Sequence, residues 1–84
     1  MTETGIGKVT HYFGHLGVAA IELHGPLAVG DTIRIHGHTT DLTMKIETMQ
    51  VNHMDVHEAQ AGTNIGIRVP EHVREHDMVL KVAP

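Results

Sequence analysis

The chain has 84 residues, which is enough for one small domain. Apolar residues make up 40% of it and cysteine is absent, so a disordered chain, a disulfide framework and thiolate chemistry are excluded. The net charge is −4 with neutral histidines, and the few basic residues are scattered singly, which excludes a strongly basic nucleic-acid surface.

Two-residue alternation of apolar and polar side chains, interrupted by glycine turns, runs along the whole chain and predicts strands. With 2% aromatic residues, the core must be aliphatic. The predicted strands cover residues 5–13, 18–23, 32–36, 42–54, 65–69 and 78–82, with one possible helical turn at 71–77. This spacing is typical of a small antiparallel β-barrel. The predicted fold class is therefore all-β, with a flexible N-terminal tail at 1–4 and one barrel domain at 5–83.

The long strand predicted at 42–54 contains an irregularity in its alternation. Met44 and Ile46 share one parity, whereas Met49 and Val51 share the other. A straight strand cannot bury both pairs on one face, because a shift of one residue turns every side chain over. The pattern predicts a bulge or bend at Glu47–Thr48.

Several segments occur in the order and spacing of a known family. They include L-x-V-G-D-x-I-x-I at 27–35, A-x-x-G-x-x-V-G at 59–66 (with Ile65 in the valine position), and the predicted strand segments at 7–9, 18–23, 48–51 and 79–82. On these segments the chain resembles the second domain of the translational GTPases elongation factor Tu and initiation factor two. It is similar also to stand-alone translation-factor-like proteins, and such barrels occur appended to some U32-type peptidases.

The resemblance implies a non-enzymatic binding module. No G-x-x-x-x-G-K-[ST] loop is present, so GTP binding is not expected. The acidic balance favours a protein partner or a second copy of the chain, while RNA or the ribosome stays open. Two alternatives remain: a histidine-rich metal-binding or pH-responsive module, and an accessory subunit of a separately encoded enzyme.

The candidate binding residues lie near two strand ends. They are Tyr12, His36, His38, Thr39, Thr40 and Asp41. Tyr12 belongs to the aromatic pair of the chain, and the other five surround one polar turn. His36 and His38 would point the same way on an extended strand, which suits a divalent transition metal, although no cofactor is otherwise expected.

Three glycines, Gly30, Gly62 and Gly66, are predicted to serve turns or close strand approaches, where a positive φ or a missing Cβ is needed. No apolar run approaches the roughly 18 residues of a membrane span, and no signal-like N-terminus is present. The expectation is a cytoplasmic protein without membrane contact.

Overall fold

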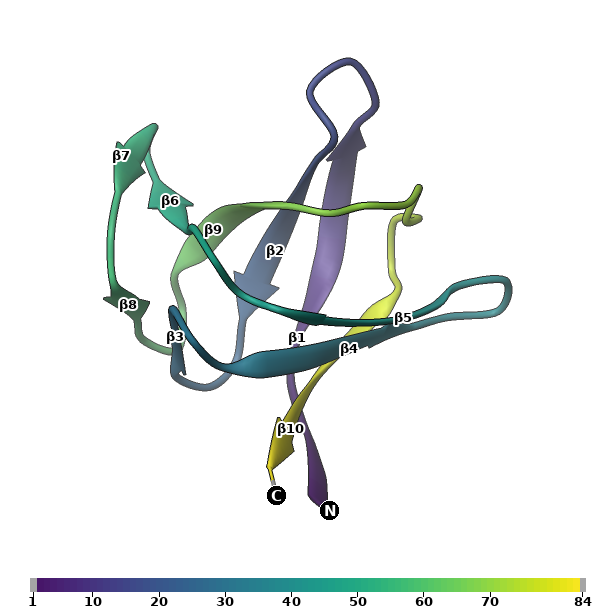
Figure 1. Ribbon diagram of the computed structural model, residues 1–84, viewed down its shortest axis with the longest axis horizontal. Helices are drawn as coiled ribbons and strands as arrows, with labels where there is room; N and C mark the ends of the chain where they lie inside the picture. The colour runs from purple at the N-terminus through teal and green to yellow at the C-terminus, as the bar shows by residue number, and fades with distance from the viewer. Residues whose placement is uncertain (1, 84) are drawn as a thin grey trace.

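The structure is a computed structural model that describes residues 2–83 (Figure 1). These residues form antiparallel strands and no helix, which confirms the predicted all-β class. The strands are β1 (Thr2–Phe13), β2 (Val18–Leu23), β3 (Leu27–Ala28), β4 (Thr32–His36), β5 (Asp41–Lys45), β6 (Gln50–Val51), β7 (Met54–Asp55), β8 (Glu58–Ala59), β9 (Asn64–Arg68) and β10 (Met78–Ala83). Within residues 2–83, no helix suited to crossing a lipid bilayer is found.

Eight of the strands form one sheet in the order β5-β4-β10-β1-β2-β9-β6-β7, and β3 pairs with β8 separately. Figure 1 shows β4 and β5 crossing β1 and β2 at a steep angle, so the sheet curls around its own inner face. The segment 71–77, where one helical turn was possible, is an irregular loop between β9 and β10.

The core fills the inside of this curled sheet with aliphatic side chains. On β2 the alternation is strict, and Ala19, Ile21 and Leu23 are fully buried. On β4 the same alternation buries Ile33 and Ile35. Burial of such side chains stabilises the fold by about 1.5–3 kcal/mol each, which explains how a domain with so few aromatic residues keeps its shape.

The first strand begins earlier than the sequence predicted. Residues 1–4 were expected to form a flexible tail, but residues 2–4 pair with 81–83 of β10, in the register Thr2↔Ala83 to Thr4↔Lys81. Glu3 also accepts a hydrogen bond from Arg34 Nη1 at 3.3 Å. The partner strand, which local sequence does not reveal, keeps this segment extended; Met1 lies outside the described residues.

The predicted bend in the long strand is confirmed. β5 ends at Lys45 and β6 begins at Gln50, and residues 46–49 between them form no strand. Ile46 and Met49, which have opposite parity, are both only 1% exposed. The break therefore lets both side chains enter the same core.

Two of the three glycines predicted at turns have the backbone that favours glycine. Gly30 has a φ of 98° and Gly62 a φ of 89°. Gly66 differs, because it lies inside β9 and has no positive φ. An added Cβ there would lie 3.5 Å from Val18 Cγ1, an ordinary contact. The residue is thus a strand position, and its assignment to a turn is wrong.

Gly37, at the end of β4, is required for a different reason. The position that a Cβ would occupy there is filled by Oδ1 of Asp77, whose side chain is buried. Oδ2 of Asp77 accepts a hydrogen bond from the backbone N–H of Arg74 at 2.9 Å, which holds the carboxylate in place. The backbone ties the loop 70–77 to Val9, because Val9 N donates to Asp77 O at 2.8 Å and His76 N donates to Val9 O at 2.7 Å.

We expect Gly37→Ala to lower the free energy of unfolding by about 1–3 kcal/mol, because the new methyl group must displace a buried, hydrogen-bonded carboxylate. Urea unfolding followed by circular dichroism measures the change. Gly14→Ala is the matched control, since its Cβ would meet Tyr12 Cε2 at a comfortable 3.7 Å. Equal stability of Gly37→Ala and wild type would contradict this account of the turn.

Candidate functional site

The structure brings five of the six predicted binding residues together at the β4–β5 turn. His36, His38 and Thr39 are exposed there, whereas Thr40 is buried. The turn is closed by a hydrogen bond from Gly37 N to Thr40 O at 2.8 Å. The burial of Thr40 leaves the two histidines, Thr39 and Asp41 as the exposed residues of the turn.

Asp41 is engaged in an ion pair with a neighbouring strand residue. Arg34 Nε donates to Asp41 Oδ1 at 2.8 Å and Arg34 Nη2 to Oδ2 at 3.0 Å, a bidentate geometry. These hydrogen bonds from Arg34 lower the pKa of Asp41 and raise that of Arg34. Because both carboxylate oxygens accept from one guanidinium, Asp41 anchors the turn to β4.

Tyr12 lies away from that turn. It is half-buried against the core, and its ring meets His72 edge-on with centroids 4.5 Å apart. Strand pairing places His36 level with Met78 and Met78 level with Lys8. Tyr12 is four residues further along β1, roughly 13 Å at 3.3 Å per residue. The structure therefore does not join Tyr12 to the other predicted residues.

The metal site predicted at His36 and His38 stays a prediction. Among the side chains of the described residues, no group of three or more histidine, aspartate or glutamate residues is placed to share a metal ion.

A groove that was not predicted from the sequence runs beside β9. It consists of three adjoining clefts with volumes of about 510, 190 and 350 Å³. The first and second clefts share Thr48 and Arg68, and the second and third share four further residues. We call it the β9 groove, defined by Leu16, Val18, Thr48, Gln50, Gly66 and Arg68.

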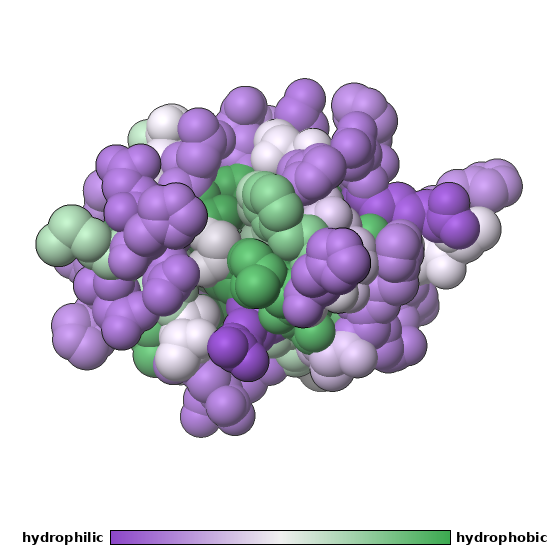
Figure 2. Space-filling view, turned by 90° about the horizontal axis from the view of Figure 1, so that it is seen from above, coloured by the Kyte–Doolittle hydropathy of each residue, from purple (hydrophilic) through white to green (hydrophobic). Residues whose placement is uncertain are grey.

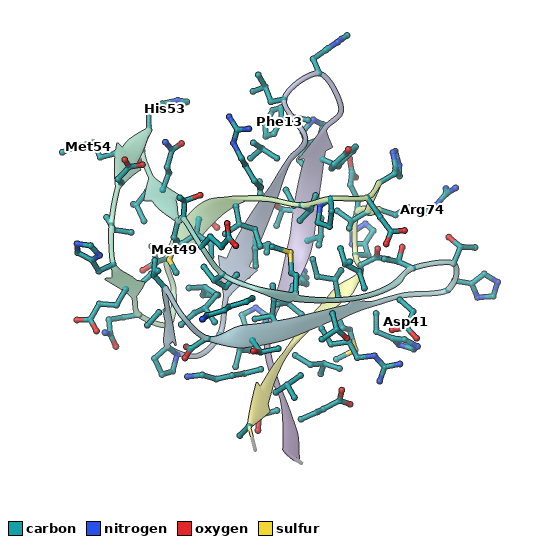
Figure 3. All side chains as sticks on the ribbon, in the orientation of Figure 1. Phe13, Asp41, Met49, His53, Met54 and Arg74 are labelled. Atoms are coloured by element: carbon teal, nitrogen blue, oxygen red, sulfur yellow. The ribbon has the colours of Figure 1, made fainter. Side chains whose placement is uncertain are left out.

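Two hairpin tips border the third cleft of the β9 groove. Phe13 and Leu16 belong to the β1–β2 hairpin, and they are 44% and 65% exposed. Asn52 and His53 form the β6–β7 tip, both with positive φ, as in two-residue hairpin turns. Figure 3 shows His53 and Phe13 near these tips, on the opposite side of the view from Asp41. The groove and the predicted turn are thus separate surfaces.

Apolar residues are concentrated on the face of the molecule that carries these hairpin tips. Figure 2 shows a hydrophobic area at the centre of that face, surrounded by hydrophilic residues. An apolar centre with a polar rim is the arrangement that binding surfaces commonly have.

One side of the groove has unpaired strand backbone. Ile46 N donates to Asp31 O at 2.8 Å, which sets the register between this segment and the start of β4. In an antiparallel pair alternate residues carry the hydrogen bonds, so the even-numbered residues of β5 bond to β4. The backbone groups of Thr43 and Lys45 then face away from β4, and β5 ends the sheet on that side.

The opposite side of the groove, at the end of β9, also has a residue whose backbone groups face away from the neighbouring strand. Val69 N donates to Gly17 O at 2.9 Å, so the odd-numbered residues of this segment bond to β2. The backbone of Arg68 faces the other way, and the pairing of β9 with β6 ends at Gln50↔Gly66. The chain segments at 44–48 and 68–70 therefore diverge from the pair Gln50↔Gly66, and each has backbone groups that face the space between them.

A signal for the groove was present in the sequence. Val18 and Ala20 are apolar, although they alternate with the buried residues Ala19 and Ile21. A strand that is apolar on both faces needs cover on both faces. The outward-facing side chains of β2, Val18 and Ala20, are therefore the sequence feature that marks the groove.

Solved structures identify the class of domain to which this fold is similar. The C-terminal domain of a Geobacillus thermoleovorans "putative U32 peptidase" superposes with a TM-score of 0.88, at 18% identity, covering 95% of this chain and 93% of that one. Its selenomethionine variant gives a TM-score of 0.85, covering 89% and 95%. At this identity the likeness shows the fold: a small all-β domain.

Curated proteins match by sequence over nearly the whole chain. An uncharacterized protease of Methanocaldococcus jannaschii is 41% identical over 75 residues, which cover 88% of this chain and 18% of that protein. A collagenase of Porphyromonas gingivalis is 38% identical over 81 residues, covering 94% and 22%. The chain thus spans about a fifth of the length of these relatives. No protein-family model matches it.

These findings correct two expectations. The resemblance to translational GTPases is wrong, because the matching proteins are named as a protease and collagenases and the matching structures come from a peptidase. The expectation of a non-enzymatic, translation-factor-like module is corrected on the same ground. The misleading motifs were turn glycines and core positions, which define a fold and carry no function.

We expect Asp41→Asn to destabilise the fold at pH 7 and to lose this effect in acid. Because Arg34 lowers the pKa of Asp41 in the folded state, the pair stabilises above the unfolded pKa of about 3.9 and is lost as the pH falls through the folded value. Urea unfolding at several pH values between 7 and 2 measures the difference from wild type. Glu71→Gln, an exposed change on the loop 70–77, is the control. A difference that stays constant down to pH 2 would contradict the assignment.

Proposed function

We propose that this chain is a domain of a U32-type peptidase and that its β9 groove holds the polypeptide substrate during hydrolysis. The observation that carries the proposal is the 41% and 38% identity, over most of this chain, to proteins named as a protease and a collagenase. The likeness of the fold to the C-terminal domain of a "putative U32 peptidase" supports it independently.

The chemistry of the groove suits an extended polypeptide. Leu16, Val18 and Gly66 supply an apolar floor and edge, and Gln50 and Thr48 supply polar groups between them. The outward-facing backbone of Arg68 adds a donor and an acceptor of the kind that an added strand pairs with. Such a surface binds main chain and alternate side chains together.

The finer architecture belongs to the same proposal. The segment 46–49 carries the chain from β5 to β6, across the space between the two ends of the sheet. We propose that this crossing segment closes the curled sheet into a small barrel.

The proposed partner of the domain is a protein, namely the catalytic part of the peptidase. The cytoplasm stays the predicted compartment. Self-association and RNA binding stay predictions.

Domain exchange tests the proposed function. In the P. gingivalis collagenase, the matching segment is deleted or replaced by this chain, and kcat/KM is measured on soluble collagen. We expect the deletion to lower kcat/KM about tenfold, the effect of losing about 1.4 kcal/mol of substrate binding, and the exchange to restore it. A folded exchange protein no better than the deletion would contradict the proposal.

Leu16→Ser in the exchanged domain sharpens this experiment. The change removes an exposed apolar side chain of the groove, so we expect kcat/KM to fall mainly through a higher KM, with little loss of stability. Val29→Ser is the matched control, because Val29 is also an exposed apolar residue but lies outside the groove. Equal activities of the two variants would show that the groove does not hold substrate.

A further inference from the structure

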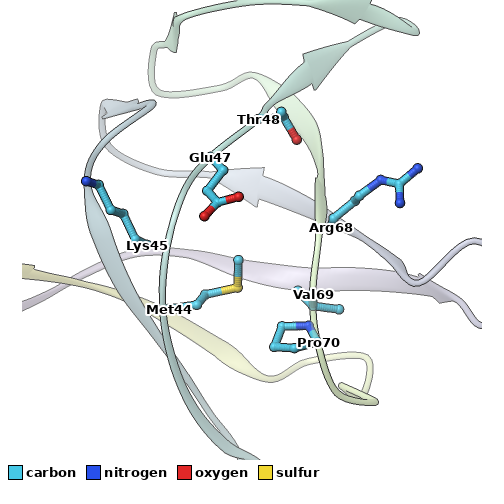
Figure 4. A pocket seen from close by; sticks show the side chains of 7 residues that line it. All are labelled: Met44, Lys45, Glu47, Thr48, Arg68, Val69 and Pro70. Carbon is cyan, nitrogen blue, oxygen red and sulfur yellow. The ribbon is translucent and has the colours of Figure 1, made fainter.

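The cleft of largest volume in the β9 groove lies between residues 44–48 and residues 68–70. It has a volume of about 510 Å³, in the range of sites that hold a small ligand or a side chain with its backbone. Figure 4 shows the two segments facing each other across this cleft.

The side chains that point into the cleft are of two kinds. Met44, Val69 and Pro70 supply apolar walls, and Glu47 extends a carboxylate from the segment 46–49 toward the opposite side (Figure 4). Met44 is half-buried and Val69 buried, so the walls are fixed by the core. Lys45 and Arg68 direct their charged ends away from the space between the segments (Figure 4).

The carboxylate of Glu47 has no assigned role in the fold. Its side chain is exposed, and among the described residues no ion pair or hydrogen bond to it is formed. Lys45 and Arg68, the other charged residues that line the cleft, likewise form no ion pair among the described residues. Glu47 is thus the one acidic side chain among the residues that line this cleft, whereas the two basic ones, Lys45 and Arg68, direct their charged ends away from it (Figure 4).

We propose that this cleft is the subsite for a lysine or arginine side chain of the bound polypeptide. The alkyl stem of such a residue packs against Met44, Val69 and Pro70, and its cationic end reaches the carboxylate of Glu47. Long basic side chains are the residues whose apolar and charged parts are separated in this way. The inference rests on the proposed function, because it assumes that the groove holds polypeptide.

The backbone on both sides of the cleft fits the same occupant. The backbone N–H and C=O of Lys45 point away from β4, and those of Arg68 point away from β2. An extended segment lying between them places alternate side chains toward the core side and toward solvent. One basic side chain then enters the cleft, while its neighbours point outward near the charged ends of Lys45 and Arg68.

Peptide binding by the full chain tests the inference. The probes are fluorescein-labelled ten-residue peptides of alanine, glycine and leucine whose central residue is lysine, norleucine or glutamate, and binding is followed by fluorescence anisotropy. We expect the lysine peptide to bind about fivefold more tightly than the norleucine peptide at low salt, and the preference to shrink as salt is added. Glu47→Gln removes the preference, whereas Glu58→Gln, an exposed change on β8, keeps it.

The outcomes separate the two proposals. Equal binding of the lysine and norleucine peptides, tighter binding of the glutamate peptide, or an unchanged preference in Glu47→Gln overturns the basic subsite but leaves polypeptide binding intact. Binding of none of the three peptides contradicts the proposed function together with the subsite. Thermal unfolding of Glu47→Gln at the wild-type temperature shows that its loss of preference is not a loss of fold.

Discussion

The rest of the structure depends on the burial of both Ile46 and Met49, two residues of opposite parity, in one aliphatic core. A continuous strand cannot do this, so β5 stops at Lys45 and pairing resumes only at Gln50. Residues 46–49 therefore lie outside the sheet, and the segment that they form diverges from β9. The cleft between residues 44–48 and 68–70 is the direct result of this packing requirement.

The groove follows from the same geometry. Where β6 and β9 meet at Gln50↔Gly66 they are paired, and beyond that point the backbone groups of Arg68 face an open space. In the adjoining cleft, the outward-facing Val18 of β2 gives an apolar floor, and the β1–β2 hairpin extends it with Leu16. The packing that fills the inner face thus leaves three adjoining clefts beside β9.

Much of the fold was predictable from the sequence, since β2 and β4 match the predicted strands at 18–23 and 32–36 to the residue. Local alternation sufficed there. It did not reveal that residues 2–4 pair with β10, because that pairing depends on a strand nearly 80 residues away. The short strands β3 and β8 were missed for the same reason.

The site was predicted less well. The abundance of histidine suggested a site at His36 and His38. The groove is instead lined by ordinary aliphatic residues such as Leu16 and Val18. Their significance depends on which face of a strand is already covered, a property of the folded sheet. The misassigned family has a similar cause, because glycine spacing reports the turns of a small β-domain and not its partner.

The most direct test of this account is an NMR titration of the ¹⁵N-labelled chain with the lysine-containing peptide. We predict that the largest amide shifts fall on groove residues, above all Val18, Thr48, Gly66 and Arg68. The β4–β5 turn at His38 and Thr39 would remain unchanged. Shifts concentrated on that turn, or none at saturating peptide, would contradict the claim that this domain holds polypeptide in the groove beside β9.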